Sequence, residues 1–192
     1  MYIREAPASF RDPGYKEVIK RFVEAAGQPV ERPCESCSRP QGSGEYCSRP
    51  CAHAAQALSS EPQRYPIEPN VLPLVFSFAR LHYLQPCWSC EGHNDGRGQL
   101  WKLPQVWFYT CSSCYAHLVG KFLWEMKTSK LLSYEWRVNL CAFGDPGCAT
   151  YIIEPARLPD DAELRKLQLD LEVMGRCCEA GITAVAYRLL LE

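Results

Sequence analysis

Cysteine pairs are the feature that most restricts how this chain folds. Twelve of its 192 residues are cysteine, and eight of them form four pairs with two or three residues between the partners. Such pairs are typical of zinc sites. The sequence shows no secretory signal and no apolar run long enough to cross a membrane, so we expect a cytoplasmic protein without a membrane partner. Thiols stay reduced in the cytosol, which favours metal ligands over disulfides.

The first set of pairs lies near the N-terminus. Cys34 and Cys37 are followed after nine residues by Cys47 and Cys51. A two-residue gap lets the backbone turn around one ion, and a three-residue gap places both sulfurs on one face of a helix that would continue through residues 52–58. We therefore predict that these four cysteines bind one zinc ion.

This set resembles a known class of zinc finger. The pair Cys34-x2-Cys37, followed by Tyr46-Cys47-Ser48-x2-Cys51, is similar to the short treble-clef fingers over residues 34–51. The resemblance implies that the four cysteines are structural zinc ligands. Such fingers serve in nucleic-acid binding, in protein contacts and as structural staples, so the resemblance leaves the role open.

The second set has the spacing of a zinc ribbon or a longer treble clef, which it resembles over residues 87–114. Cys87 and Cys90 are followed after twenty residues by Cys111 and Cys114. Two such turns supply the four thiolates of a tetrahedral zinc site. We predict a second closed site here, and therefore two zinc ions per chain.

Each pair of the second set is followed at the same offset by a histidine, His93 or His117. The sequence leaves open whether either histidine ligates metal or lies beside the thiolates. A catalytic zinc needs an open coordination position and a general base, for which Glu91 and Asp95 stand in the right loop. Four thiolates make zinc a poor Lewis acid, so we predict no catalytic residue.

The net charge of the chain and the positions of its aromatic residues indicate whether it could bind nucleic acid. The chain carries 21 basic and 22 acidic residues, so it lacks the positive excess that drives sequence-independent binding. Aromatic side chains near the second set would stack on bases or form the core of a small zinc domain. These residues are Trp88, Trp101, Trp107, Phe108, Tyr109 and Trp124, and the basic residues near them are Arg97, Lys102, Lys121, Lys127 and Lys130.

Hydrophobic periodicity predicts both helices and strands. Helices are predicted over 15–26, 74–84, 115–127 and from 162 to 178, with Gly181 separating the last helix from an apolar end. Strands are predicted over 106–110, 134–140 and 149–153, the last two as a hairpin. Residues 61–73 contain four prolines, which predicts an extended linker.

Four cysteines remain after the two sets are assigned: Cys141, Cys148, Cys177 and Cys178. Adjacent helical residues point about 100° apart, which makes Cys177 and Cys178 an unusual pair of ligands. The sequence leaves open whether these four thiols form a third site or are buried as small apolar side chains.

The predicted protein is therefore α+β and consists of small zinc-stapled domains. Residues 1–60 would hold a helix and the treble-clef-like finger, 61–73 a Pro-rich linker, and 74–192 a zinc-ribbon-like domain with a β-hairpin and a C-terminal helix. We predict a zinc-binding, non-enzymatic interaction or regulatory adaptor with a protein partner, and with nucleic acid as a second class of partner. The alternative is a zinc-dependent enzyme that acts on a nucleic acid or nucleotide through the loop 91–98. The sequence leaves the oligomeric state open.

Overall fold

The computed structural model describes residues 14–26, 28, 67–143 and 148–192. The predicted finger with Cys34, Cys37, Cys47 and Cys51 lies outside the described residues, as do residues 61–66 of the predicted linker.

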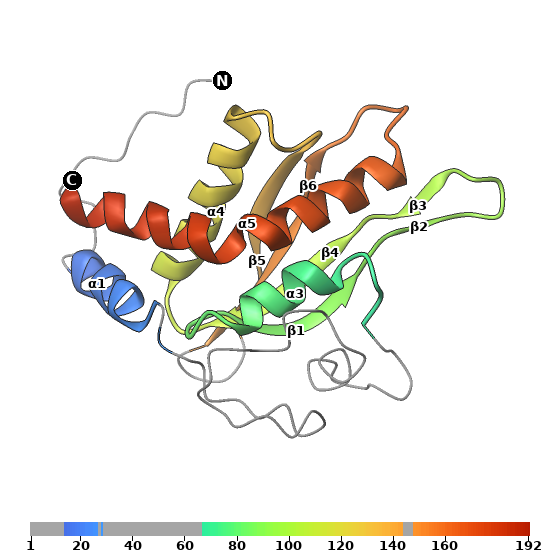
Figure 1. Cartoon of the computed structure of the whole chain (residues 1–192). Coiled ribbons are helices and arrows are strands. Elements are labelled where there is room, and N and C mark those ends of the chain that lie inside the picture. Colours follow the sequence, from blue (N-terminus) through green and yellow to red (C-terminus); the bar gives the residue numbers. More distant parts are fainter. Residues whose placement is uncertain (1–13, 27, 29–66, 144–147) are drawn as a thin grey trace, which may run out of the picture.

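The described residues form helices packed on antiparallel sheet, which confirms the α+β class (Figure 1). The larger sheet has the strand order β1-β4-β6-β5, and a smaller sheet pairs β2 with β3. Figure 1 shows the β2–β3 hairpin extending away from the helices. In chain order the elements are α1 (Tyr15–Ala25), α3 (Leu72–Ala79), β1 (Gln85–Cys90), β2 (His93–Asn94), β3 (Leu100–Lys102), β4 (Gln105–Thr110), α4 (Ser113–Thr128), β5 (Glu135–Phe143), β6 (Ala149–Arg157) and α5 (Leu164–Leu191).

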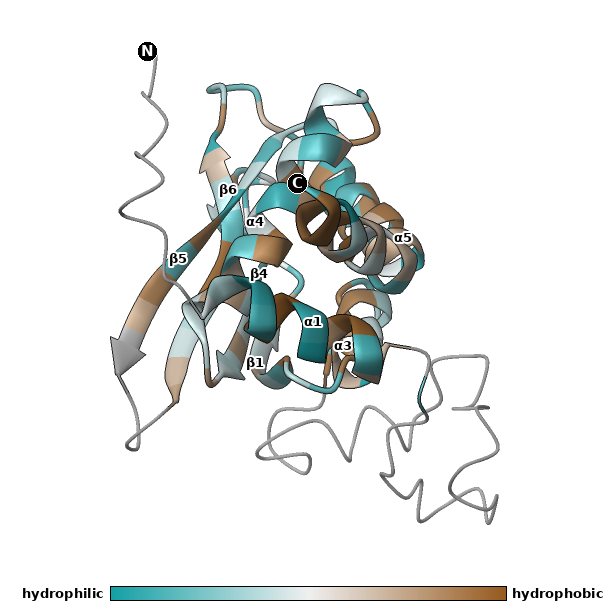
Figure 2. Ribbon diagram, turned by 90° about the vertical axis from the view of Figure 1, so that its left-hand side faces the viewer, coloured by the Kyte–Doolittle hydropathy of each residue, from teal (hydrophilic) through white to brown (hydrophobic). Residues whose placement is uncertain are grey.

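Burial alternates along the central strand β4 and defines the two faces of the sheet. Val106 and Phe108 are fully buried in the core, while Trp107 between them points to the opposite face. Figure 2 shows α1, α3 and α5 on one side of the strands. Residues from α1, α3, α4 and α5 share one core cluster with this buried face. The second face is not covered by any described helix.

Helix α1 contributes to the same core as the C-terminal elements. Its residues Ile19 and Phe22 are buried in the shared cluster. Helix α3 begins at Leu72, inside the stretch predicted to be an extended linker. Pro73 fits there because the first turn of a helix tolerates proline, whose missing N–H would have no intrahelical partner. Pro73 therefore lies in the first turn of a helix and not in an extended linker.

The C-terminal helix is longer than the sequence predicts. Helix α5 continues through Gly181, where a Cβ atom would lie 2.4 Å from the ring of Phe122 in α4. At Gly175 a Cβ atom would lie 2.6 Å from the carbonyl carbon of Pro73 in α3. Both glycines therefore permit close helix packing, and neither ends the helix. Within the described parts of the chain, no helix combines the length and apolar character that a membrane crossing requires.

Candidate metal centre

Three side chains suited to metal binding converge where the segment before α3 meets the end of β1. The ligand atoms of Glu68, Cys90 and His93 all lie within 4.8 Å of one another. Among the residues that the structure describes, no other group of three histidine, cysteine or acidic side chains meets this condition. Cys90 is buried, whereas Glu68 and His93 are half-exposed.

The turn from Cys90 to His93 has the form of a metal-binding knuckle. Cys90 ends β1, His93 begins β2, and the Gly92 N–H donates a hydrogen bond to the Cys90 sulfur. Gly92 has a φ of +81°, which favours glycine. A Cβ atom there would also lie 2.8 Å from Leu164 Cδ1. Glycine at residue 92 therefore makes this turn sterically accessible.

Glu68 connects the segment before α3 to this turn through both carboxylate oxygens. Its Oε1 lies 2.9 Å from His93 Nε2, and its Oε2 accepts a hydrogen bond from the Glu91 N–H at 2.7 Å. The Glu91 carboxylate accepts in return from the backbone N–H and the side-chain amide of Asn70, at 2.8 and 2.9 Å. The hydrogen bonds thus run in both directions between the segment 68–70 and Glu91, and they hold Glu68 close to Cys90 and His93.

The electrostatics of Cys90 depend on its burial and its charged neighbours. Burial raises the pKa of the Cys90 thiol, and the Glu68 carboxylate raises it further, whereas the Gly92 N–H and Lys102 lower it. A bound cation would oppose the first two effects because a coordinated thiol is held as the thiolate. Metal binding here would therefore release a proton.

The kinds of donor atom in this group suit zinc, and so does the distance between Glu68 and His93. Thiolate sulfur, imidazole nitrogen and carboxylate oxygen are the three kinds of ligand found in protein zinc sites. Zinc bonds of about 2.0 Å to nitrogen and oxygen place those two atoms about 3.3 Å apart in a tetrahedron. Glu68 Oε1 and His93 Nε2, at 2.9 Å, would therefore move apart by only about 0.4 Å.

The structure does not gather the four cysteines of the predicted second site. In the register of β1 with β4, Cys90 lies opposite Gln105, whereas Tyr109 lies opposite Gln85 at the other end of β1. Cys111 and Cys114 follow β4 and therefore lie beyond that other end. Among the described residues, Cys87, Cys111 and Cys114 belong to no group of three convergent ligands. Cys90 is thus the one predicted ligand that the candidate centre contains.

Cys87 lies at a bulge of β1, between Pro86 and Trp88. Burial raises the pKa of its thiol to about 11, although the Tyr109 hydroxyl donates to the sulfur and opposes this effect. A strand directs neighbouring side chains to opposite faces, so the Cys-x2-Cys spacing does not produce a compact turn here.

The other residues named with the predicted second site have separate structural contacts. The ring centroid of His117 in α4 lies 6.2 Å from that of Tyr15 in α1. Asp95 Oδ1 accepts from the N–H groups of Arg97 and Gln99, both at 2.8 Å, and so organises the turn between β2 and β3.

Glu68 is the member of the candidate centre that sequence reasoning missed. It lies in the Pro-rich stretch, and no spacing motif links it to Cys90 and His93. Only the fold of the segment before α3 brings its carboxylate to the turn. The Cys90-x2-His93 spacing therefore identified two members of the candidate centre, and it did not identify Glu68.

The remaining cysteines are dispersed over the molecule. Cys141 and Cys148 are exposed beside the β5–β6 connection, Cys177 is half-buried and Cys178 is buried in α5. In the described ranges none of these four thiols belongs to a group of three convergent ligands.

The aromatic and basic residues do not form one continuous surface. Phe108 is a core residue, whereas Trp88 and Trp107 make an edge-to-face contact, with ring centroids 5.6 Å apart, on the sheet face opposite the helices. Lys102 Nζ lies 5.3 Å from the Trp88 ring centroid. A second such pair, Lys121 and Trp124, lies on helix α4.

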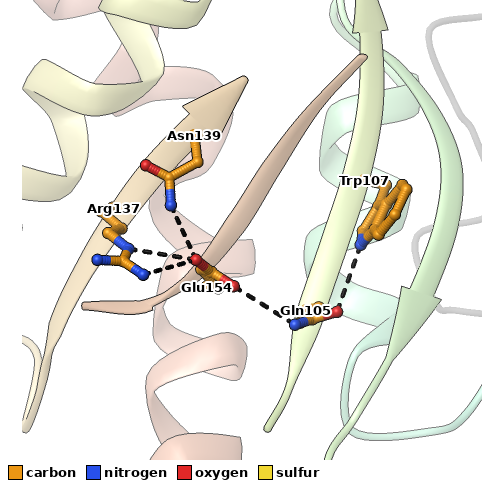
Figure 3. Close-up of polar contacts among 5 residues, drawn as sticks. All are labelled: Gln105, Trp107, Arg137, Asn139 and Glu154. Atoms are coloured by element: carbon orange, nitrogen blue, oxygen red, sulfur yellow. Dashed lines mark hydrogen bonds and ion pairs between the residues drawn. The ribbon is translucent and has the colours of Figure 1, made fainter. Parts of the chain in front are cut away.

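A polar network crosses the same open sheet face. Figure 3 shows the Glu154 carboxylate of β6 accepting hydrogen bonds from Arg137 and Asn139 of β5 and from Gln105 of β4. The side-chain amide oxygen of Gln105, Oε1, accepts a hydrogen bond from Trp107 Nε1 at 3.4 Å. The Glu154 carboxylate therefore bonds to side chains of both strands that flank β6.

Comparison of the chain with protein-family models, with curated proteins and with solved structures finds no match.

Proposed function

We propose that this chain is a zinc-binding protein of the interaction or regulatory class, with zinc held by Glu68, Cys90 and His93. The observation that supports the proposal is the convergence of their three ligand atoms within 4.8 Å. The Gly92 N–H to Cys90 sulfur hydrogen bond is a further feature of a metal-binding turn. Thiolate and imidazole ligands favour zinc over calcium or magnesium, which prefer oxygen.

The position of the centre suggests an architectural role. Zinc at this point would join the segment before α3 to the junction of β1 and β2. It would thereby fix the base of the β2–β3 hairpin, which carries the exposed side chains of Arg97 and Trp101. Tryptophan and arginine are enriched among the residues that contribute most to protein interfaces. A metal that orients such a hairpin fits an interaction protein.

The second candidate function is zinc-dependent catalysis, and the number of ligands favours it. Catalytic zinc sites usually have three protein ligands and one position for water. The nearby carboxylates argue against this candidate, because Glu91 is bonded to Asn70 and Asp95 to its own turn. Both would have to break existing hydrogen bonds to act as a general base, so we rank recognition above catalysis.

Zinc binding to single-site variants tests the proposal. Glu68→Gln, Cys90→Ser and His93→Gln should each reduce the zinc content by one ion per chain, or weaken zinc affinity by more than about 100-fold. Competition with a chromophoric chelator would measure the affinity, and elemental analysis the content. Glu172→Gln, Cys148→Ser and His82→Gln are matched controls outside the centre and should leave zinc binding unchanged. Unchanged zinc binding in the three test variants would contradict the proposal.

A further inference from the structure

We infer that the Glu68–Cys90–His93 centre keeps one coordination position open and binds a carboxylate ligand there, with Lys102 as the counter-charge. This inference rests on the proposed zinc site. It adds the class of ligand that the metal recognises.

The number of protein ligands supports an open position. Zinc in proteins is usually four-coordinate, and the described residues supply three convergent ligand atoms. Glu91 is held away by the two hydrogen bonds from Asn70. Asp95 is held by the N–H groups of the hairpin turn. A fourth ligand from solution would complete the tetrahedron.

Solvent access supports an exchangeable ligand. The side chains of His93 and Glu68 are 42% and 31% exposed, so the centre opens to solvent on the side of these two residues. Cys90 lies on the buried side. The open position would therefore face solvent, where a ligand can enter and leave.

The charge balance favours a single negative charge. Zinc with one thiolate, one carboxylate and a neutral imidazole has no net charge. Lys102 pairs with His93 across the hairpin, which places the two side chains on the same face. A monoanion with an oxygen donor, such as a carboxylate, would bind the metal and neutralise this lysine.

Cobalt substitution provides the test. Cobalt(II) adopts zinc-like coordination and absorbs visible light, so its spectrum reports the ligands of the centre. The difference between the spectra of the cobalt-loaded full chain and of its Cys90→Ser variant isolates this centre from any other cobalt site. Titration with acetate should change this difference spectrum with saturation. Lys102→Gln should weaken acetate binding about tenfold, because it removes a nearby positive charge.

A matched control uses the other lysine that lies over a tryptophan ring. Lys121 Nζ is 5.7 Å from the Trp124 ring centroid on α4, so Lys121→Gln removes the same kind of contact away from the centre. It should leave acetate affinity unchanged. Equal acetate affinity in the wild type and in Lys102→Gln would overturn the assigned role of Lys102.

The outcomes separate this inference from the proposed function. If the wild type and Cys90→Ser give identical cobalt spectra, the centre does not bind metal and both proposals fail. If the spectra differ but acetate causes no change, the metal site stands and the open carboxylate position is wrong.

Discussion

Asp170 is a buried carboxylate that connects helix α5 to the start of strand β5. It is 2% exposed and accepts hydrogen bonds from the backbone N–H groups of Ser133 and Tyr134, at 2.8 and 3.0 Å. The indole N–H of Trp136 donates to the same carboxylate at 2.9 Å. The carboxylate thus pairs with the N–H of the buried Trp136 side chain and with two partly buried backbone N–H groups.

Replacement of this carboxylate should destabilise the protein strongly. We expect Asp170→Ala to lower the free energy of unfolding by about 4 kcal/mol, because it leaves three donors without their acceptor. Urea unfolding followed by circular dichroism would measure the change. Asp161→Ala, at an exposed position, is the control and should change stability by less than about 0.5 kcal/mol. A loss below about 1 kcal/mol for Asp170→Ala would show that water replaces the carboxylate.

Two glycines in helix interiors provide a test of how closely the helices pack. Gly175 in α5 faces the backbone of α3, where a Cβ atom would lie 2.6 Å from the Pro73 carbonyl carbon and 2.7 Å from the Leu74 nitrogen. Gly120 in α4 has nothing within 4 Å of its ideal Cβ position. The two sites therefore separate helix propensity from steric contact.

The same substitution should have opposite effects at these two glycines. Gly175→Ala should lower the free energy of unfolding by about 2 kcal/mol, because backbone atoms of α3 must move. Gly120→Ala should raise it by about 0.5–1 kcal/mol, because alanine favours the helix. Thermal unfolding of the two variants would measure both changes. Stabilisation by both substitutions would mean that α3 lies farther from α5 than the structure shows.

Local sequence patterns predicted the elements that depend on local periodicity. The helices α1 and α4 and the β5–β6 hairpin lie close to their predicted ranges, because their apolar residues recur at helical or alternating spacing. The helix break at Gly181 was wrong. Residue 181 is glycine because the ring of Phe122 on another helix leaves no space for a Cβ atom, and local sequence does not reveal this contact.

The candidate centre was only partly predictable for the same reason. The Cys90-x2-His93 spacing drew attention to the turn, and the structure places both side chains in the centre. The partners assigned to Cys90 depended on how β1 and β4 pair, and their register sets Cys90 opposite Gln105. Glu68 is brought in by tertiary contacts alone. Pairing register and the fold of a Pro-rich segment are not encoded in cysteine spacing.

The extent of the apolar core predicts how the described part of the chain would respond to removal of a bound metal. One cluster of buried side chains extends from Ile19 in α1 to Ala186 in α5. A core of this extent supplies folding free energy that small zinc fingers lack. The described domain should therefore remain folded without metal, although less stable.

Chelation should lower the melting temperature without unfolding the chain at room temperature. Zinc at 100 times its dissociation constant stabilises a site by about 2.7 kcal/mol, which corresponds to about 5–10 °C for a chain of this size. Differential scanning calorimetry would measure the shift, and far-ultraviolet circular dichroism the helix content. Cys90→Ser should show a smaller shift than the wild type. Loss of helical signal on chelation at 25 °C would mean that metal, and not the core, maintains the fold.

The β2–β3 hairpin is anchored at its base and extends away from the helices (Figure 1). A two-stranded hairpin has little stability of its own, so its direction is set by the contacts of Gly92, His93 and Glu68 at that base. From His93 to the turn at Gly96 the chain covers about 10 Å, so a rotation of about 10° at the base moves the tip by about 2 Å. A small change in geometry at the base of the hairpin would therefore displace the exposed Arg97 near its tip.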